Sequence, residues 1–257
     1  MSEPDGVVGR VARLLRAVSQ SPSDGATTTQ VARAASLPRA SAHRLLESLT
    51  AEGLVDRDQR SGRWFLGPEL YVLGVAAAPR YDLTSEARES VHRLCQATGE
   101  SAFFSVRRGD ETVCLVREDG SFPIRSFVLF EGSRFPLGVV SAGIVVLAYL
   151  PDAEIDAYLE AVDLTDRWGA SHSGDEIRRR VAETREHGWS VNPGLVVEGS
   201  WGMAAAIFDA QGRPHAALSL NGVESRFRPE RQDEMGRLLL DEAHALSAAG
   251  RSGVRRR

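Results

Sequence analysis

The sequence predicts an N-terminal winged helix-turn-helix, mostly α-helical with a β wing, followed by a larger α+β domain. Residues 27–66 combine two short helical patterns with a charged hairpin. The rest of the chain alternates strand-like runs with amphipathic helices, which is typical of an α+β sheet domain. With 257 residues and 42% hydrophobic content, the chain can bury two modest cores. We therefore expect two domains.

Caps and hydrophobic periodicity define the helices of the first domain. A first helix over Val7–Val18 carries one apolar face. Thr27–Thr29 then offer hydroxyl caps to a second helix, and Pro38 opens a third at its first turn, where a missing N–H costs nothing. In the third helix an apolar stripe recurs at i, i+3, i+4 and i+7, namely Ala42, Leu45, Leu46 and Leu49. This spacing predicts a helix pair on a shared core.

The opposite face of the third helix lies where a recognition helix usually meets the edges of DNA bases. Its candidate contacts are Arg39, Ala40, Ser41, His43 and Arg44. Gly53 ends the helix, and two apolar segments, Leu54–Val55 and Trp64–Leu66, predict a hairpin wing. Three arginines on or beside the wing could touch phosphate or the minor groove: Arg57, Arg60 and Arg63. Any solvated amphipathic helix shows the same stripe, so the prediction of DNA binding depends largely on the hairpin.

The charge distribution supports DNA binding only weakly. Residues 1–66 hold nine Arg against seven acidic residues, a balance of +2, and the remainder holds 22 Arg against 28, a balance of −6. The sum is the net charge of −4. All 31 basic residues are Arg, which excludes a Walker A loop, a Schiff base and a Ser-x-x-Lys nucleophile. We expect no cofactor.

The N-terminus and the two cysteines indicate the compartment. Residues 1–10 lack the apolar region of a secretion signal, and the longest apolar run, Val139–Leu150, is too short and too interrupted to span a bilayer. We expect a cytoplasmic protein. Cys95 and Cys114 fall on apolar faces, so two buried free thiols are favoured over a disulfide. No His or Cys stands at ligand spacing beside either cysteine, so no metal site is expected.

The second domain is predicted from alternating patterns after a boundary near residue 80. The expected division is a winged helix over 1–67, a helical linker over 68–82, an α+β domain over 83–248 and a disordered basic tail over 249–257. Thr84–Glu86 should cap its first helix. Strands are expected over Ser101–Arg107, Glu111–Arg117, Ile124–Phe130, Trp201–Asp209 and Pro214–Gly222. Helices are expected around Ser141–Leu150, Asp152–Ala161 and Ser173–His187, with a last one opening at Pro229.

Motifs along nearly the whole chain occur in a specific order and spacing. The first domain contains LPRASAHRLLESLTAEGLVDRD from Leu37 and GRWFLGPELYVLG from Gly62. The second contains Thr98–Glu100, PLGVVSAGIVVLAYL from Pro136, REHGW from Arg185 and AAAIFDAQGRPHAALSLNG from Ala204. Together they resemble the IclR-type bacterial transcription regulators. The resemblance implies a dimer, or a dimer of dimers, whose winged helices bind a palindromic DNA operator and whose GAF-like second domains bind a small metabolite.

The same resemblance maps the ligand pocket of the family onto six residues. Ser141 and Ala142 fall where backbone amides at a helix start face an anionic effector, and a helix N-terminus carries about half a positive charge. The remaining polar or small positions of the pocket correspond to Asn192, Gly202, Ser219 and Asn221. The resemblance therefore implies effector contacts at these six positions.

The chain departs from the family pattern around this pocket. Gly138 and Ile144 stand where the family commonly has His and Lys, and Leu195 replaces an acidic residue. Asn192 stands where some members have a carboxylate. The neighbourhood is thus more apolar, which favours a larger, carboxylate-bearing or aromatic effector over glyoxylate or pyruvate. A vestigial pocket lined by ordinary core residues is the alternative.

An enzyme and an interaction protein that does not bind DNA are the competing classes. Ser141 and Ser200 lie among glycines, but neither fits Gly-x-Ser-x-Gly at the correct spacing after a strand. A serine-dependent hydrolase would need a base, for which His172, His187 and His215 are available, although scattered His are usually solvated or structural. The expected function is a ligand-responsive transcriptional regulator, with a repressor favoured over an activator, and not an enzyme.

Overall fold

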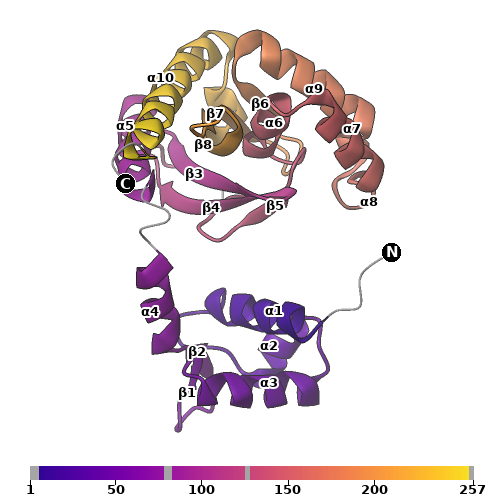
Figure 1. The fold of residues 1–257 in the computed structure, drawn as a ribbon, viewed down its shortest axis with the longest axis vertical. Helices are drawn as coiled ribbons and strands as arrows, with labels where there is room; N and C mark the ends of the chain where they lie inside the picture. The colour runs from indigo at the N-terminus through magenta and orange to yellow at the C-terminus, as the bar shows by residue number, and fades with distance from the viewer. Residues whose placement is uncertain (1–5, 78–82, 125–127, 255–257) are drawn as a thin grey trace. The chain divides into compact units, whose positions relative to one another are not determined.

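The structure is a computed structural model that describes residues 6–77, 83–124 and 128–254 (Figure 1). The chain divides into two compact units, Met1–Tyr81 and Asp82–Arg257. Each unit has a hydrophobic core of its own. The finer division into linker and domain boundaries stays a prediction.

The first unit is a helix-turn-helix with a short β hairpin. Its elements are α1 (Val7–Ser19), α2 (Thr28–Ala34), α3 (Arg39–Ala51), β1 (Val55–Arg57), β2 (Trp64–Leu66) and α4 (Pro68–Ala77). Thr27 caps α2 in a reciprocal capping box with Gln30, as its hydroxyl position predicted. The apolar stripe of α3 is buried at Ala42, Leu46 and Leu49, and Leu45 packs against the same core. The predicted winged helix is therefore confirmed.

The second unit is built on one antiparallel sheet of six strands, in the order β5-β4-β3-β8-β7-β6. The strands are β3 (Ser101–Arg108), β4 (Glu111–Glu118), β5 (Arg134–Pro136), β6 (Ser190–Pro193), β7 (Ser200–Phe208) and β8 (Pro214–Val223). The central strands β3 and β8 bring together segments that are about half the chain apart. Side chains alternate between two faces of this sheet, so each face has a distinct set of neighbours.

Helices cover the two faces of the sheet differently. α5 (Leu83–Thr98) and α10 (Pro229–Val254) lie together on one face, over a core that includes Phe104, Met203 and Leu218 (Figure 1). On the other face α6 (Ser141–Ala148) packs its Ala142 and Val145 against alanines of β7 and β8. Outside α6 lie α7 (Asp152–Ala161), α8 (Thr165–Trp168), η2 (Ala170–His172) and α9 (Gly174–His187). The predicted α+β class is confirmed.

The strand predicted over Ile124–Phe130 is wrong. Ile124 and residues 128–130 form no strand, and residues 125–127 lie outside the described residues. On the side of β4 away from β3, the paired strand is Arg134–Pro136. Leu129 instead packs against Phe103 and Cys114 of the sheet. The apolar pattern therefore reflects a loop lying over the sheet, since burial alone gives no information about backbone pairing.

Two boundaries and one strand also differ from the prediction. Thr84–Glu86 lies within α5, which already begins at Leu83, because hydroxyl and acidic residues suit the first turn of a helix as well as its cap. α10 continues through Val254, so residues 249–254 are helical and not a disordered tail, and residues 255–257 lie outside the described residues. Ala248 and Ala249 are strong helix formers that extend the helix past the predicted end. The edge strand β6 was not predicted, because its four residues lie between two turn glycines.

Candidate functional site

The recognition helix α3 presents its predicted DNA contacts at the surface. Arg39, Ala40 and Arg44 are exposed, and Ser41 and His43 are half-buried. A surface hollow is lined by Arg39, Ala40, His43 and Arg44, all on one face of the helix. Within the described ranges no carboxylate pairs with Arg39 or Arg44. Their guanidinium groups are therefore available to a phosphate or a base edge.

Contacts between α3 and the wing fix the orientation of His43 and Arg57. His43 meets the ring of Trp64 edge-on, with ring centroids 6.0 Å apart, and its Nε2 lies 3.5 Å from Glu47 Oε1. Arg57 Nη1 lies 3.3 Å from the same Glu47 oxygen, and its guanidinium sits 5.1 Å from the centre of the Trp64 ring. Trp64 is fully buried and donates from Nε1 to Thr28 Oγ1 at 2.9 Å. The wing is thus held against the recognition helix.

The other two wing arginines differ in what they contact. Arg63 donates from Nη1 to Gly25 O at 2.7 Å and lies 3.2 Å from Asp24 Oδ2, so it ties the base of the wing to the loop before α2. Arg60 lies at the exposed tip, in a turn where Asp58 Oδ1 accepts from the Arg60 amide at 3.2 Å. The Arg60 side chain is the freer of the two to reach DNA.

The predicted effector residues fall on one face of the sheet. Cross-strand pairing aligns Ser101, Asn221, Gly202 and Asn192 in a single row over β3, β8, β7 and β6. The neighbouring row contains Phe103, Ser219, Ala204 and Ser190. These residues share the face that α6 covers, because Ala204 packs against α6. Four residues far apart in the chain are thereby brought beside Ser141 and Ala142.

Gly202 lies close to the start of α6 and to Asn221. A β-carbon at Gly202 would lie 3.2 Å from Ser141 Oγ and 3.4 Å from each side-chain polar atom of Asn221. Both side chains therefore converge on the glycine, from the helix start and from the adjacent strand. Any larger residue at this position would fill the space between them.

Two polar atoms of this face have no partner in the described part of the chain. They are Ser219 Oγ and Asn221 Oδ1, both buried from solvent. The backbone amides of Ser141 and Ala142 also lack a bonded acceptor among the described residues. The first hydrogen bonds of α6 are donated by Gly143 and Ile144 to Val140 O, and no side chain caps the helix. Buried polar groups are normally hydrogen-bonded, so these two side-chain atoms and two amides, the polar cluster behind α6, can bond a polar ligand.

Asn192 differs from the other predicted contacts. Its Nδ2 donates to Val139 O at 2.8 Å, and its Oδ1 accepts from the Leu195 amide at 3.0 Å. Both ends of the buried amide are therefore engaged with the backbone. The sequence pattern gave no indication of this, because both partners are backbone groups, and Val139 lies in a loop far from Asn192 in the chain.

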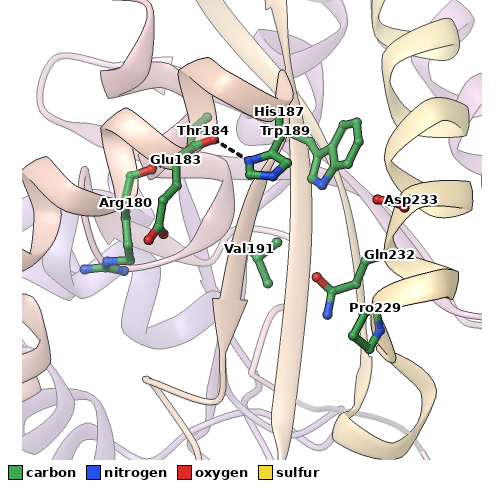
Figure 2. A pocket seen from close by; sticks show the side chains of 9 residues that line it. All are labelled: Arg180, Glu183, Thr184, His187, Trp189, Val191, Pro229, Gln232 and Asp233. Atoms are coloured by element: carbon green, nitrogen blue, oxygen red, sulfur yellow. Dashed lines mark hydrogen bonds between the residues drawn. The ribbon is translucent and has the colours of Figure 1, made fainter.

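A second cavity lies outside the predicted sites. Figure 2 shows it between α9, β6 and the start of α10, with a volume of ≈ 360 Å³ and Trp189 and Gln232 in its lining. The Arg180 side chain extends away from Trp189 and Gln232 in this view (Figure 2). No residue of this lining was predicted as an effector contact, since the helix and strand patterns mark these positions as ordinary surface or core.

Two of the three histidines weighed as catalytic bases contact backbone carbonyls. His172 Nδ1 lies 2.9 Å from Trp168 O, and His187 Nδ1 lies 2.8 Å from Glu183 O. Within the described residues no three His, Cys, Asp or Glu side chains group as a metal site would require. Cys95 and Cys114 are both buried thiols outside any disulfide, as predicted, and burial raises the pKa of the Cys114 thiol to about 12.

Across the described ranges, every helix is too short or too polar to cross a lipid bilayer.

Comparison with known proteins agrees with this arrangement. Residues 7–59 match the IclR helix-turn-helix domain, and residues 75–248 match the C-terminal domain of bacterial IclR transcriptional regulators. The repressor AllR of Salmonella paratyphi A is 30% identical over 215 residues, which cover 83% of this chain and 78% of AllR.

Solved structures of the same kind superpose on nearly the whole chain. An IclR transcriptional regulator from Alicyclobacillus acidocaldarius gives a TM-score of 0.79 at 25% identity, with 95% of this chain and 98% of that one covered. An IclR homologue from Microbacterium hydrocarbonoxydans, solved in complex with 4-hydroxybenzoate, gives 0.77 at 23% identity over 96% and 100% of the two chains.

Fold and site together define a helix-turn-helix transcriptional regulator with a separate α+β domain. The chain belongs to the IclR family of bacterial transcriptional regulators. Its relatives are named as regulators rather than enzymes, in line with the expected class.

Proposed function

We propose that this protein is a ligand-responsive repressor that binds a palindromic DNA operator in the bacterial cytoplasm. The observation that carries the proposal is the presence, in one chain, of an exposed recognition helix and of the polar cluster behind α6, whose atoms lack partners in the described part of the chain. The first can bind DNA and the second can bind a small molecule, and a regulator needs both.

The proposed DNA contacts divide between bases and phosphates. Arg39, Ala40, Ser41, His43 and Arg44 are proposed to face the major groove from α3, and Arg57 and Arg60 to meet phosphate or the minor groove from the wing. Arg63 is proposed to act through the wing that it anchors, because its contacts with Asp24 and Gly25 engage its guanidinium. An electrophoretic shift on the DNA upstream of its own gene would test this assignment.

The proposed assembly is a dimer or a dimer of dimers. α4 is apolar on all sides and buries none of its residues within the chain, with Tyr71 77% and Leu73 51% exposed. Val7 and Val8 at the start of α1 are exposed as well. A single winged helix reads only a few base pairs, so two copies are needed for a palindrome. Sedimentation showing a monomer at micromolar concentration with undiminished operator binding would contradict the proposal.

The proposed effector is a small organic acid, larger or more apolar than glyoxylate, such as an aromatic carboxylate. Its carboxylate would accept from the Ser141 and Ala142 amides, and its other end would meet Ser219 and Asn221 across Gly202. The related regulator solved with 4-hydroxybenzoate makes this compound the first to test.

A thermal-shift screen of carboxylic and aromatic acids tests the effector proposal. A ligand at 100 times its Kd adds about 2.7 kcal/mol of stability to the folded state, which is readily detected as a higher Tm. A Tm shift that occurs in wild type and is absent in Gly202→Val would support effector binding at the polar cluster behind α6. If no acid shifts the Tm of the second unit, this site is vestigial.

A further inference from the structure

The segment directly before α6 is held by an unusual set of side chains. Tyr158 of α7 donates from its hydroxyl to Leu137 O, and Arg180 of α9 donates from Nη2 to Gly138 O at 3.1 Å. Asn192 of β6 donates to Val139 O at 2.8 Å, and His172 Nε2 lies 3.3 Å from the same oxygen. Three successive carbonyls are thus bonded to side chains from three different elements, α7, α9 and β6.

This segment has little freedom to move for steric reasons too. Gly138 adopts φ +92°, and a β-carbon there would lie 2.9 Å from Ile177 Cδ1. Beyond Val139 the chain enters α6 at Val140, whose carbonyl accepts from Gly143 and Ile144. The direction of the first α6 amides is therefore set by the peptide planes at 137–139.

Arg180 is poorly suited to a purely stabilising role. The residue is 4% exposed, and its Nε and Nη1 have no hydrogen-bond partner in the described part of the chain. Burial, together with the charge of Arg179, lowers the pKa of Arg180 to about 10. An unpaired buried cation is unfavourable for folding, and an apolar side chain of similar length commonly replaces such a group without loss of stability. Its two acceptors, Gly138 O and Ser171 O, suggest that Arg180 fixes local geometry.

We propose that Tyr158, Arg180 and Asn192 form a carbonyl clamp, a set of positioning residues that orient the Ser141 and Ala142 amides toward the effector. The clamp rests on the proposed effector site but makes no contact with the effector itself. It reassigns Asn192 from ligand contact to ligand positioning, because neither polar end of its amide is free. Effector affinity is then set partly by residues behind the helix, on α7, α9 and β6.

Hydrogen exchange of the full-length protein without ligand tests the clamp. The amides of Leu137, Val139, Gly143 and Ile144 are hydrogen-bonded, so a peptide over 137–144 reports on this segment. Arg180→Met should raise exchange there at least about tenfold, as expected for loss of a hydrogen bond to a charged donor. Exchange in β7 and β8 should stay at the wild-type rate, and Arg180→Lys, which restores an ammonium donor, should reverse most of the change.

Arg179→Met is the matched control, because Arg179 is adjacent to Arg180 in the chain but is exposed and paired with Glu176 and Glu183. It should leave the 137–144 peptide unchanged. The clamp is overturned if Arg180→Met leaves that peptide unchanged, or if exchange rises equally in β7 and β8, which would indicate a general structural role. Should Arg180→Met fail to fold, Tyr158→Phe, which removes only the hydroxyl on Leu137 O, decides in the same way.

Ligand binding provides an independent readout. With 4-hydroxybenzoate as the probe, a wild type that binds it should lose about tenfold in affinity on Arg180→Met and recover with Arg180→Lys. A wild type that does not bind the probe counts against this effector class and not against the clamp, because the exchange result needs no ligand.

Discussion

The recognition helix α3 and the polar cluster behind α6 present their candidate residues in opposite ways. On α3 the candidate residues are exposed, contiguous in the chain and opposite a buried stripe. Behind α6 they are buried, come from three strands and a helix start, and include backbone amides and carbonyls. The proposed DNA contacts are therefore brought together by helical periodicity, whereas the proposed effector contacts are brought together by strand register and loop geometry. The predictions below test how independent the two regions are.

The largest expected effect comes from the residue that joins α3 to its wing. Trp64→Ala should destabilise the first unit by about 3–5 kcal/mol, because a fully buried indole and its bond to Thr28 are lost. Operator binding should disappear, while the second unit unfolds as in wild type. Chemical denaturation followed by hydrogen exchange separates the two units. Trp64→Phe, which loses the Nε1 donor but keeps most of the ring volume, should cost much less.

Equal destabilisation of both units by Trp64→Ala would contradict the separation. It would mean that the two cores depend on each other, although each unit has a hydrophobic core of its own.

A smaller effect should separate base reading from phosphate contact. Arg44→Ala is expected to cost about 1–3 kcal/mol in operator affinity and to relax specificity at one base pair per half-site. Arg60→Ala at the wing tip should weaken all sequences alike and reduce the salt dependence of binding. Footprinting on operator variants at several salt concentrations distinguishes these outcomes.

Arg63→Ala serves as the control for the wing. Because Arg63 is tied to Asp24 and Gly25, its loss should lower the stability of the first unit before it changes the salt slope. If Arg44→Ala and Arg60→Ala give the same sequence-independent loss, Arg44 does not read a base.

The smallest expected effect is a pH dependence confined to the second unit. Burial first, and then the nearby Arg180, lowers the pKa of His172, and burial lowers that of His215. Both side chains stay neutral in the folded state while the unfolded chain takes up protons below its ordinary pKa of 6.5. Stability should therefore be fully present above that pH and fall as the pH is lowered through it. Urea denaturation across this range measures it.

The double variant His172→Gln and His215→Gln should flatten this acid-side loss. A variant that keeps the wild-type slope would show that other groups titrate on unfolding, and the buried histidines would then play no part in the pH response.

The winged helix was predictable because its signals are local. The capping box at Thr27, the proline at the start of α3 and the stripe at Ala42, Leu46 and Leu49 each lie within one or two turns. The role of Arg63 was not predictable in the same way. Its partners, Asp24 and Gly25, are 38 residues or more earlier in the chain, and only the packing of the wing brings them together.

The positions of the proposed effector contacts came from family resemblance, which gave no indication of what those residues contact. Asn221, Gly202 and Asn192 form one row only because β6, β7 and β8 pair in a particular register. The partners of Asn192 and Arg180 are carbonyls, which every residue possesses, so side-chain patterns give no sign of them. The loop around Leu129 shows the reverse case, in which apolar alternation predicts a strand and packing gives a loop.

The most direct test of the whole account is operator affinity measured by fluorescence anisotropy with and without an effector found by thermal shift. Wild type should change its operator Kd on adding the effector. Asn221→Leu should bind the operator as tightly as unliganded wild type and lose the effector response, because the ligand group facing Asn221 is left unpaired at a cost of about 1–3 kcal/mol. An Asn221→Leu protein that keeps the full effector response, or one that loses operator binding while folded, would contradict the proposed division between recognition and sensing.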